Sequence, residues 1–320
     1  MTVLAVEDLH VGFELEDGAE VHAVRGVSLA VERGARLGLV GESGCGKTTT
    51  LLALMGLLPA NAWVSGRVLV DGRELLAGGD RTARPLRWTE IAMVPQGAMN
   101  ALNPVRTVGR QIAEPMLVHG TQSRRGAEAR TRELLELVGI PPGRAERYPH
   151  EFSGGMRQRL TIAMALACEP KILLADEPTT ALDVMVQAQV LALLARLCDE
   201  LDLALVLVTH DLAVIAQLCH RAVVMYAGTL AETGPVDALY HHPGHPYTRR
   251  LFEATPALRG TRRLVSIPGV PPRLDRPHVG CPFEPRCDRR FEPCPVITPA
   301  LLQLDAQHAA ACHLNDPAMT

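Results

Sequence analysis

The sequence predicts an α/β protein with a mostly parallel sheet, an antiparallel β-subdomain, a helical insertion and a small cysteine-rich C-terminal extension. Two observations support this fold class. Short apolar runs rich in β-branched residues alternate with longer helical patterns, which is typical of a parallel sheet with helices on its faces. After about residue 240, Pro, Arg, His and Cys become frequent and the periodicity fades. We therefore expect a separate extension there.

The expected elements follow in chain order. Two strands within residues 1–35, joined at "EDGAE", form the antiparallel addition. Between about 97 and 167 the pattern is mainly helical, and "AEARTRELLELVGI" closes on Gly139 and Pro141, which predicts a helical insertion. The parallel strands are expected at "RLGLV", "KILLAD", "LALVLVT" and "RAVVMY", with helices after the first three at 47–57, 184–197 and 211–219.

Composition places the chain of 320 residues among ordinary globular proteins. It has 47% hydrophobic and 21% charged residues and a net charge of −3. Its apolar runs, such as "LALVLV", are far shorter than the roughly 18 residues that a membrane span needs. The N-terminus lacks the basic start and long apolar stretch of a signal peptide. We therefore expect a cytosolic chain in which disulfide bonds do not form.

The segment "GESGCGKTT", Gly41 to Thr49, follows an expected strand and opens an expected helix. It matches the phosphate-loop pattern G-x-x-x-x-G-K-[ST] in the context that this pattern requires. Backbone N–H groups would surround the β-phosphate of a nucleotide, Lys47 would reach the β- and γ-phosphate oxygens, and the Thr48 hydroxyl would ligate Mg²⁺. The alternative is a glycine-rich turn that binds no ligand.

Polar residues also end three other strands. In "KILLADEP", Asp176 could hold the magnesium shell, and Glu177 could act as general base toward an attacking water. Two adjacent acids are otherwise a solvated loop. His210 ends "VLVTH" and could contact the γ-phosphate, although a lone histidine at a strand end is more often structural. Gln96, which ends "IAMVPQ", is ambiguous on its own.

A second glycine-containing segment, "EFSGGMRQRL", places Ser153, Gly154 and Gly155 directly before a helical pattern. The start of a helix can bind an anion through its backbone N–H groups. The chain therefore has two candidate phosphate cradles, about a hundred residues apart.

Together, "GESGCGKTT", "VPQ", "FSGGMRQRL", "LLADEPTTALD" and "LVTHD" resemble, in order and spacing, the ATP-binding subunits of ATP-binding cassette (ABC) transporters. The resemblance covers roughly residues 3–240 and implies the P-loop NTPase fold. It implies that Gln96 senses the γ-phosphate and Mg²⁺, that "ALD" at 181–183 passes signals between subunits, and that His210 is the switch histidine. It also implies that Ser153, Gly154 and Gly155 clamp a nucleotide held by another subunit, so that one chain supplies only half-sites.

The resemblance assigns a complete set of site residues. Glu177, His210 and Lys47 would be catalytic, and Thr48, Gln96 and Asp176 would hold Mg²⁺. ATP would be bound by Gly41, Glu42, Ser43, Gly44, Cys45, Gly46, Lys47, Thr48, Thr49, Gln96, Phe13, Ser153, Gly154, Gly155, Met156 and Asp183.

This sequence departs from the family pattern at a few positions. Phe152 stands where Leu is usual and Met156 where many members have Gln, but neither change removes the serine hydroxyl or the N–H donors. The aromatic side chain that stacks on adenine is not obvious. Phe13 is the nearest candidate, and His22 is a weaker one.

Two segments resemble the peptide-permease branch of this family. Residues 96–115 contain "ALNP", similar to the "SLNP" of those ATPases, and residues 241–256 resemble their segment beyond the core cassette. Asn103 and Pro104 would then lie near the surface that receives a membrane subunit's coupling helix, although the segment could be only a polar loop. The implied organisation is an ABC nucleotide-binding domain at 1–240, with its helical subdomain at about 97–167, and an oligopeptide-transporter-type extension at 241–320.

The resemblance implies an ATPase that energises import of dipeptides or oligopeptides, peripheral at the cytoplasmic face of the cell membrane. Its partners would be a second ABC ATPase subunit, identical or related, two transmembrane permease subunits and, indirectly, an extracytoplasmic substrate-binding protein, with no nucleic acid. The alternatives are an importer of nickel or another small solute, a non-transport ABC ATPase of DNA repair or translation, and a regulatory half without turnover.

Four of the eight cysteines cluster near the C-terminus, with the spacing C-x5-C-x6-C-x17-C. Such crowding in a reducing compartment suggests a metal site rather than disulfides. The spacing lacks the paired C-x2-C of zinc ribbons, and two of these cysteines precede Pro, as in bacterial ferredoxins. The family resemblance implies a [4Fe–4S] cluster, with zinc or no metal as alternatives and His313 as a less favoured ligand. The four ligands would be Cys281, Cys287, Cys294 and Cys312.

Overall fold

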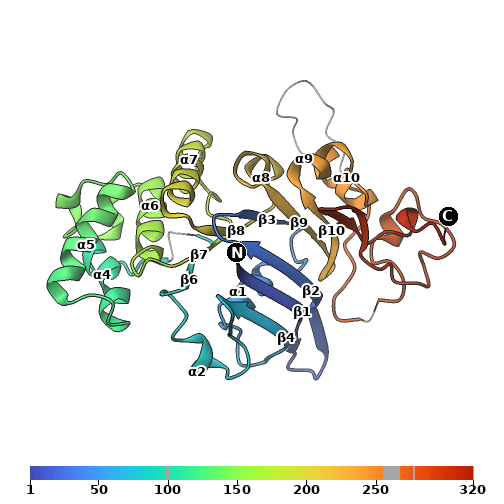
Figure 1. Cartoon of the computed structure of the whole chain (residues 1–320), viewed down its shortest axis with the longest axis horizontal. Helices are drawn as coiled ribbons and strands as arrows, with labels where there is room; N and C mark the ends of the chain where they lie inside the picture. The colour runs from blue at the N-terminus through green and yellow to red at the C-terminus, as the bar shows by residue number, and fades with distance from the viewer. Residues whose placement is uncertain (98–100, 255–266, 277, 320) are drawn as a thin grey trace. The chain divides into compact units, whose positions relative to one another are not determined.

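The computed structural model describes residues 1–97, 101–254, 267–276 and 278–319. Its contacts divide the chain into two compact units, both visible in Figure 1. Parts of the two segments that resemble peptide-permease ATPases, residues 98–100 and 255–256, lie outside the described residues. Unit 1 comprises Met1–Ala5, Ala30–Ala35 and Val68–Val206, and unit 2 comprises Val6–Leu29, Arg36–Arg67 and Leu207–Thr320.

Unit 2 contains a run of five hydrogen-bonded strands in the order β3-β9-β10-β12-β11. Strand β3 is parallel to β9, whereas β9, β10, β12 and β11 are joined by antiparallel pairings. The strands are β3 (Arg36–Val40), β9 (Arg221–Tyr226), β10 (Thr229–Pro235), β11 (Leu302–Asp305) and β12 (His308–Ala310). The helices of this unit are α1 (Lys47–Leu54), α8 (Leu212–Leu218), α9 (Val236–His241) and α10 (Pro246–Glu253), with 3-10 turns at Glu284–Arg286 and His313–Asn315.

The C-terminal segment joins this sheet because a buried carboxylate links the two. Glu232 on β10 is fully buried and accepts hydrogen bonds from the backbone N–H groups of Gly244 (2.6 Å) and His245 (3.0 Å) and from His308 Nε2 (2.6 Å). A buried carboxylate needs such partners. The segment expected as a separate extension therefore adds strand β12 to β10.

Four strands contribute residues to both units: β1 (Thr2–Glu14), β2 (Glu20–Glu32), β4 (Ala62–Val70) and β8 (Ala204–Thr209). Within unit 2, β2, β1 and β4 are neighbours in that order. The turn between β1 and β2 is closed by the Leu15 N–H, which donates to the Ala19 carbonyl over 2.8 Å. The two expected N-terminal strands are thus present.

Unit 1 contains β5 (Arg73–Glu74), β6 (Ile91–Val94) and β7 (Ile172–Asp176), with β6 parallel to β7. Figure 1 shows α4, α5 and α6 side by side in green and yellow-green, and the contacts of these helices agree. They occupy the region whose pattern is mainly helical. The helices are α2 (Asp80–Ala83), α4 (Val108–Val118), α5 (Arg124–Leu137), α6 (Gly154–Ala165) and α7 (Val184–Leu201), with 3-10 turns at Pro142–Arg144 and Pro149–Glu151.

Most expected elements are confirmed: strands β3, β7, β8 and β9 and helices α1, α7 and α8 lie within a few residues of their expected bounds. Every residue of β7 and β8 is buried, as expected for strands covered on both faces. Helix α5 begins where the Ser123 hydroxyl accepts the Gly126 N–H (3.2 Å) and ends before Gly139 at φ 75°. Across the described ranges, no helix combines the length and apolar character that crossing a bilayer requires.

Candidate nucleotide-binding site

The phosphate loop lies in unit 2 between β3 and α1. Its last glycine, Gly46, has φ 101°, and a Cβ there would lie 2.4 Å from the Ala23 carbonyl oxygen, so only glycine fits. Gly46 is also the N-cap of α1 and has no side chain to cap the first N–H groups. These donors and the exposed Ser43, Gly44 and Thr48 are therefore available to a phosphate.

Lys47 is held in the loop by backbone oxygens. Its side chain turns back so that Nζ donates to the carbonyls of Gly41 (2.7 Å) and Glu42 (2.8 Å), and the residue is only 7% exposed. A buried ammonium requires such acceptors. Phosphate oxygens also accept hydrogen bonds from an ammonium group, and they carry negative charge. The position of Lys47 therefore suits the binding of a triphosphate.

The acidic pair lies in unit 1 at the end of β7. Asp176 is 1% exposed, and Glu177 follows it with φ 43°, a strained conformation for a residue other than glycine. Glu177 Oε2 accepts hydrogen bonds from Gln96 Nε2 (3.0 Å) and Thr180 Oγ1 (2.8 Å). Two donors from different segments thus orient this carboxylate.

Strand register explains why Gln96 meets Glu177. In the parallel pair β6 and β7, Val94 lies opposite Ala175. Gln96 and Glu177 each come two residues later, so their side chains leave the same edge of the sheet. The structure therefore brings together two residues that the sequence singled out separately.

The second glycine segment opens α6 in unit 1. The exposed Ser153 is its N-cap, and the Ser153 hydroxyl accepts the Met156 N–H over 3.4 Å. A Cβ at Gly155 would lie 2.2 Å from Val186 Cγ1 of α7, so this position requires glycine. Phe152 is 4% exposed beneath the Arg144 guanidinium, 4.6 Å from the ring centroid.

The remaining predicted residues occupy separate places. Asp183 is exposed and caps α7 by accepting the Val186 N–H (3.0 Å). His210 is exposed directly after β8 in unit 2, and Phe13 is half-buried on β1. His22 lies between two rings: its Nε2 is 3.2 Å from His10 Nδ1, and its ring centroid is 5.0 Å from that of Trp63. Partial burial lowers the pKa of His22.

Sequence reasoning missed two residues that contact the phosphate loop. Arg286 pairs with the Glu42 carboxylate, and the Tyr247 hydroxyl accepts the Glu42 N–H. Both lie beyond residue 240, where the periodicity fades. The sequence feature closest to these residues is "HHPGHPYTRR", which indicates the subfamily but predicts no contact with the phosphate loop.

The four clustered cysteines are free thiols, of which Cys294 and Cys312 are buried. The Cys281 N–H donates to the Cys294 carbonyl over 2.8 Å. Burial raises the pKa of the Cys281 thiol to about 12.

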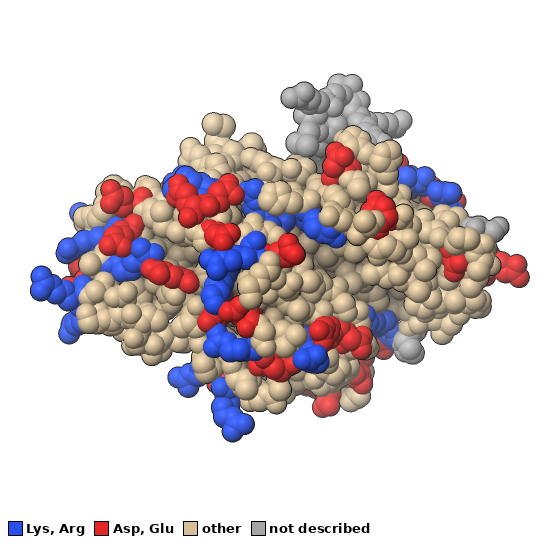
Figure 2. Space-filling view, in the orientation of Figure 1, with Lys and Arg blue, Asp and Glu red and all other residues tan. Residues whose placement is uncertain are grey.

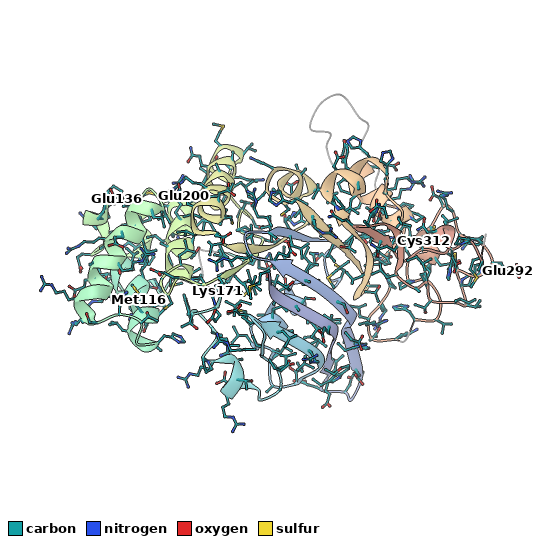
Figure 3. The ribbon with its side chains drawn as sticks, viewed as in Figure 1. Met116, Glu136, Lys171, Glu200, Glu292 and Cys312 are labelled. Atoms are coloured by element: carbon teal, nitrogen blue, oxygen red, sulfur yellow. The ribbon has the colours of Figure 1, made fainter. Side chains whose placement is uncertain are left out.

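Among the described residues, however, no group of three or more His, Cys, Asp or Glu side chains is arranged to hold a metal ion. The expected iron–sulfur ligand set is therefore not supported by the side-chain geometry. The ring of His313 is buried and contacts the Ile297 carbonyl through Nε2 at 2.7 Å. Figure 3 labels Cys312 within this segment.

Comparison with known proteins gives two family matches. The family described as "ABC transporter" matches residues 24–180, and the family "Oligopeptide/dipeptide transporter, C-terminal region" matches residues 231–294.

Relatives match over nearly their full lengths. A probable peptide ABC transporter ATP-binding protein of Sinorhizobium fredii is 48% identical over 97% of this chain and 94% of the relative. The dipeptide transport ATP-binding protein of Bacillus subtilis is 46% identical over 98% and 95%, and the oligopeptide transport ATP-binding protein of Escherichia coli is 45% identical over 93% and 89%.

Solved ABC cassettes share the fold. A dimeric ATP-binding cassette in a post-hydrolysis state, bound to ADP and Pi, superimposes with a TM-score of 0.64 at 28% identity. The match covers 73% of this chain and 98% of the cassette. The chain therefore belongs to the ABC transporter family, as an ATPase subunit of the oligopeptide/dipeptide type.

Proposed function

We propose that this chain hydrolyses ATP to drive the import of dipeptides or oligopeptides, as a peripheral subunit at the cytoplasmic face of the membrane. Two matches support the peptide class: relatives that are 46% and 45% identical carry the names dipeptide and oligopeptide transport ATP-binding protein. The match of residues 231–294 to the C-terminal region of such transporters supports it independently of the cassette.

In the proposed mechanism, the phosphate loop binds the triphosphate first. The N–H groups at the start of α1 donate to phosphate oxygens, and Lys47 exchanges its two carbonyl partners for β- and γ-phosphate oxygens. Oxygen ligands suit Mg²⁺, and those of Thr48, Asp176 and Gln96 would hold it. The ion would neutralise charge that develops on the phosphate oxygens.

Glu177 then acts on the attacking water. The carboxylate that Gln96 and Thr180 orient accepts a proton from the water as its oxygen bonds to the γ-phosphorus, and the bond to the ADP oxygen breaks in line. The observation that carries the proposal is this oriented carboxylate, held by Gln96 through strand register. His210 would contact the γ-phosphate.

A second ATPase subunit would complete the site. Ser153 is exposed at the start of the twelve-residue helix α6, where its hydroxyl and the N–H groups of Gly154 and Gly155 can meet a γ-phosphate from outside. Nearby in the chain, the adjacent apolar side chains of Val184 and Met185 are 81% and 73% exposed, which suits a subunit interface. We propose an identical or related subunit here, together with two permease subunits and, indirectly, a substrate-binding protein.

Surface charge is consistent with protein partners. Figure 2 shows Lys and Arg interspersed with Asp and Glu on the face in view, without the one-sign surface typical of nucleic-acid binding.

A decisive experiment reconstitutes the chain with its cognate second ATPase and permease subunits in vesicles. Glu177→Gln should abolish ATP turnover and uptake of labelled dipeptide and oligopeptide while Mg-ATP binding persists. Glu200→Gln provides a matched control, because Glu200 lies on α7 in an exposed pair with Arg196. Uptake of nickel or another solute in place of peptides would reject the peptide class, and ATP turnover that coupled to no solute would favour a non-transport ATPase.

The [4Fe–4S] cluster is a separate proposal, supported by the spacing of the four cysteines. Their described geometry does not form a ligand set, so no step above depends on a cluster. Protein purified without oxygen should contain about four iron and four sulfide per chain if the proposal holds. Zinc, or no metal, would overturn it.

A further inference from the structure

Glu42, in the phosphate loop, is bound by the C-terminal segment through both its side chain and its backbone N–H. The two carboxylate oxygens accept a bidentate pair from Arg286, with Nη1 to Oε2 at 2.6 Å and Nη2 to Oε1 at 2.9 Å. The Glu42 N–H donates to the Tyr247 hydroxyl at 2.9 Å. All three residues belong to unit 2.

The Arg286 side chain is held in place by burial and by hydrogen bonds from its guanidinium group. The side chain is 4% exposed. Besides its two bonds to Glu42, Nε donates to the Pro268 carbonyl (2.8 Å), Nη2 to the Ile267 carbonyl (3.3 Å) and Nη1 to the Tyr226 hydroxyl (3.1 Å). All five guanidinium N–H donors therefore have acceptors.

Tyr247 is fixed by packing. Its ring is fully buried, 4.5 Å from the Tyr226 ring and 5.3 Å from the Phe283 ring by centroids. Tyr226 ends β9, whereas Tyr247 and Phe283 come from the C-terminal segment. Rigid groups from this segment thus bind the loop at one point.

Glu42, which these groups bind, also contacts the catalytic Lys47. The Glu42 carbonyl accepts the Lys47 ammonium at 2.8 Å, so a shift of the Glu42 peptide moves an acceptor of Lys47. The Glu42 charge also lies one residue after the start of the loop that receives a triphosphate. Without Arg286, this carboxylate would oppose the phosphates.

The C-terminal segment also makes hydrogen bonds to strand β2. The Leu274 carbonyl accepts the His22 N–H (3.2 Å) and Arg25 Nη2 (3.1 Å). The C-terminal segment therefore contacts both the phosphate loop and β2 within unit 2.

We propose that Arg286 and Tyr247 are positioning residues for ATP, through which the C-terminal segment sets the conformation and charge of the phosphate loop. The inference rests on the proposed function, because it assumes that the loop binds Mg-ATP. It gives the C-terminal segment a direct role in nucleotide affinity, in addition to any role in assembly.

The test measures Mg-ATP affinity of the full chain by calorimetry in a Glu177→Gln background, where hydrolysis does not interfere. Arg286→Gln should weaken binding about tenfold, because it leaves the loop carboxylate without its counter-charge. The double variant Glu42→Gln, Arg286→Gln should recover most of this affinity. A purely structural arginine predicts no recovery, since the double variant still lacks the bonds to Ile267, Pro268 and Tyr226.

Two further variants keep the result interpretable if Arg286→Gln folds poorly. Tyr247→Phe removes only the acceptor of the Glu42 N–H and should weaken binding about threefold with an unchanged melting temperature. Arg290→Gln is the matched control, because Arg290 forms an exposed pair with Glu284 in the same segment and should bind ATP normally. Wild-type-like affinity in both Arg286→Gln and Tyr247→Phe would overturn the inference. Failure of the Glu177→Gln parent itself to bind Mg-ATP would instead reject the proposed function.

Discussion

The phosphate loop and the segment at Ser153 both place glycines at the start of a helix, but their surroundings differ. In the phosphate loop, Lys47 and Glu42 are bound by carbonyls and by side chains of the same unit. Ser153 is exposed, and its hydroxyl accepts the Met156 N–H as the cap of helix α6. The phosphate loop is thus held by contacts within its own unit, whereas the Ser153 segment presents its hydroxyl and N–H donors to solvent. This difference is the one that the proposed composite site requires, in which each subunit would bind one nucleotide and close another.

The largest expected effect comes from removing the loop cation. Lys47→Ala should lower ATP turnover by at least about 100-fold and weaken Mg-ATP binding by the isolated chain, because the loop loses its charge toward the phosphates. Lys171→Ala is a matched control, since Lys171 is the only other lysine and pairs with Asp71 and Glu90 within unit 1. Turnover assays and calorimetry measure both. Equal losses in the two variants would contradict the role of Lys47.

The next effect tests the packing beneath the Ser153 segment. Gly155→Ala puts a Cβ 2.2 Å from Val186 Cγ1, so we expect about 1–3 kcal/mol of destabilisation and a loss of turnover as α6 is displaced. Val186→Ala should restore much of both in the double variant. Gly154→Ala is the control for stability, because its Cβ would lie 3.7 Å from Leu182, an ordinary contact. Thermal melts and ATPase rates distinguish them, and a stable, active Gly155→Ala would refute the packing argument.

A smaller effect separates binding in one chain from closure by another. Ser153→Ala should leave Mg-ATP affinity of the isolated chain unchanged but reduce turnover of the assembled transporter about tenfold, because the lost hydroxyl would serve the partner's nucleotide. It also removes a helix cap, at a cost of about 1 kcal/mol.

Ser123→Ala separates these two consequences. Ser123 caps α5 in the same way, by accepting the Gly126 N–H, so its loss should cost similar stability without changing turnover. Weaker ATP binding by isolated Ser153→Ala would contradict the assignment of this serine to a second subunit's site.

Local patterns predicted the parts of the site that short-range rules control. The glycines before α1 and α6 predict both helix starts as candidate phosphate-binding segments. The carboxyl ends of parallel strands lie at one edge of a sheet, which accounts for the contact between Gln96 and Glu177. The contact between Glu42 and Arg286 spans 244 positions of sequence. It depends on the path of a segment whose apolar residues show no regular period, and no local rule determines such a path.

The same reason explains why the C-terminal segment was expected to be separate. Its attachment depends on buried polar groups, Glu232 with His308 and the N–H groups after α9, rather than on an amphipathic pattern. The four cysteines illustrate a different limit: their spacing predicts a ligand set, but spacing does not fix the directions of side chains, and no metal-holding group is arranged among the described residues.

The last expected effect is a pH dependence that arises at this attachment. His245 is fully buried at the start of α10, where its Nδ1 accepts the Tyr247 N–H (3.0 Å), and burial lowers the pKa of His245 from 6.5 to about 4. Below pH 6.5 the unfolded chain therefore takes up a proton that the folded chain does not. The free energy of unfolding should fall as the pH drops from 6.5 to 4, by up to about 3 kcal/mol.

His245→Asn should remove this dependence, because Asn can still accept the Tyr247 N–H as a helix cap but does not titrate. Urea unfolding at pH 7 and pH 5 measures the difference between the two proteins. Amide hydrogen exchange locates it: protection in α10 should fall at pH 5 in the wild-type chain more than in the variant, while protection in α5 of unit 1 should change equally in both. An equal loss of α10 protection in both proteins would mean that another group controls the acid response, and the buried imidazole would then contribute only its hydrogen bond.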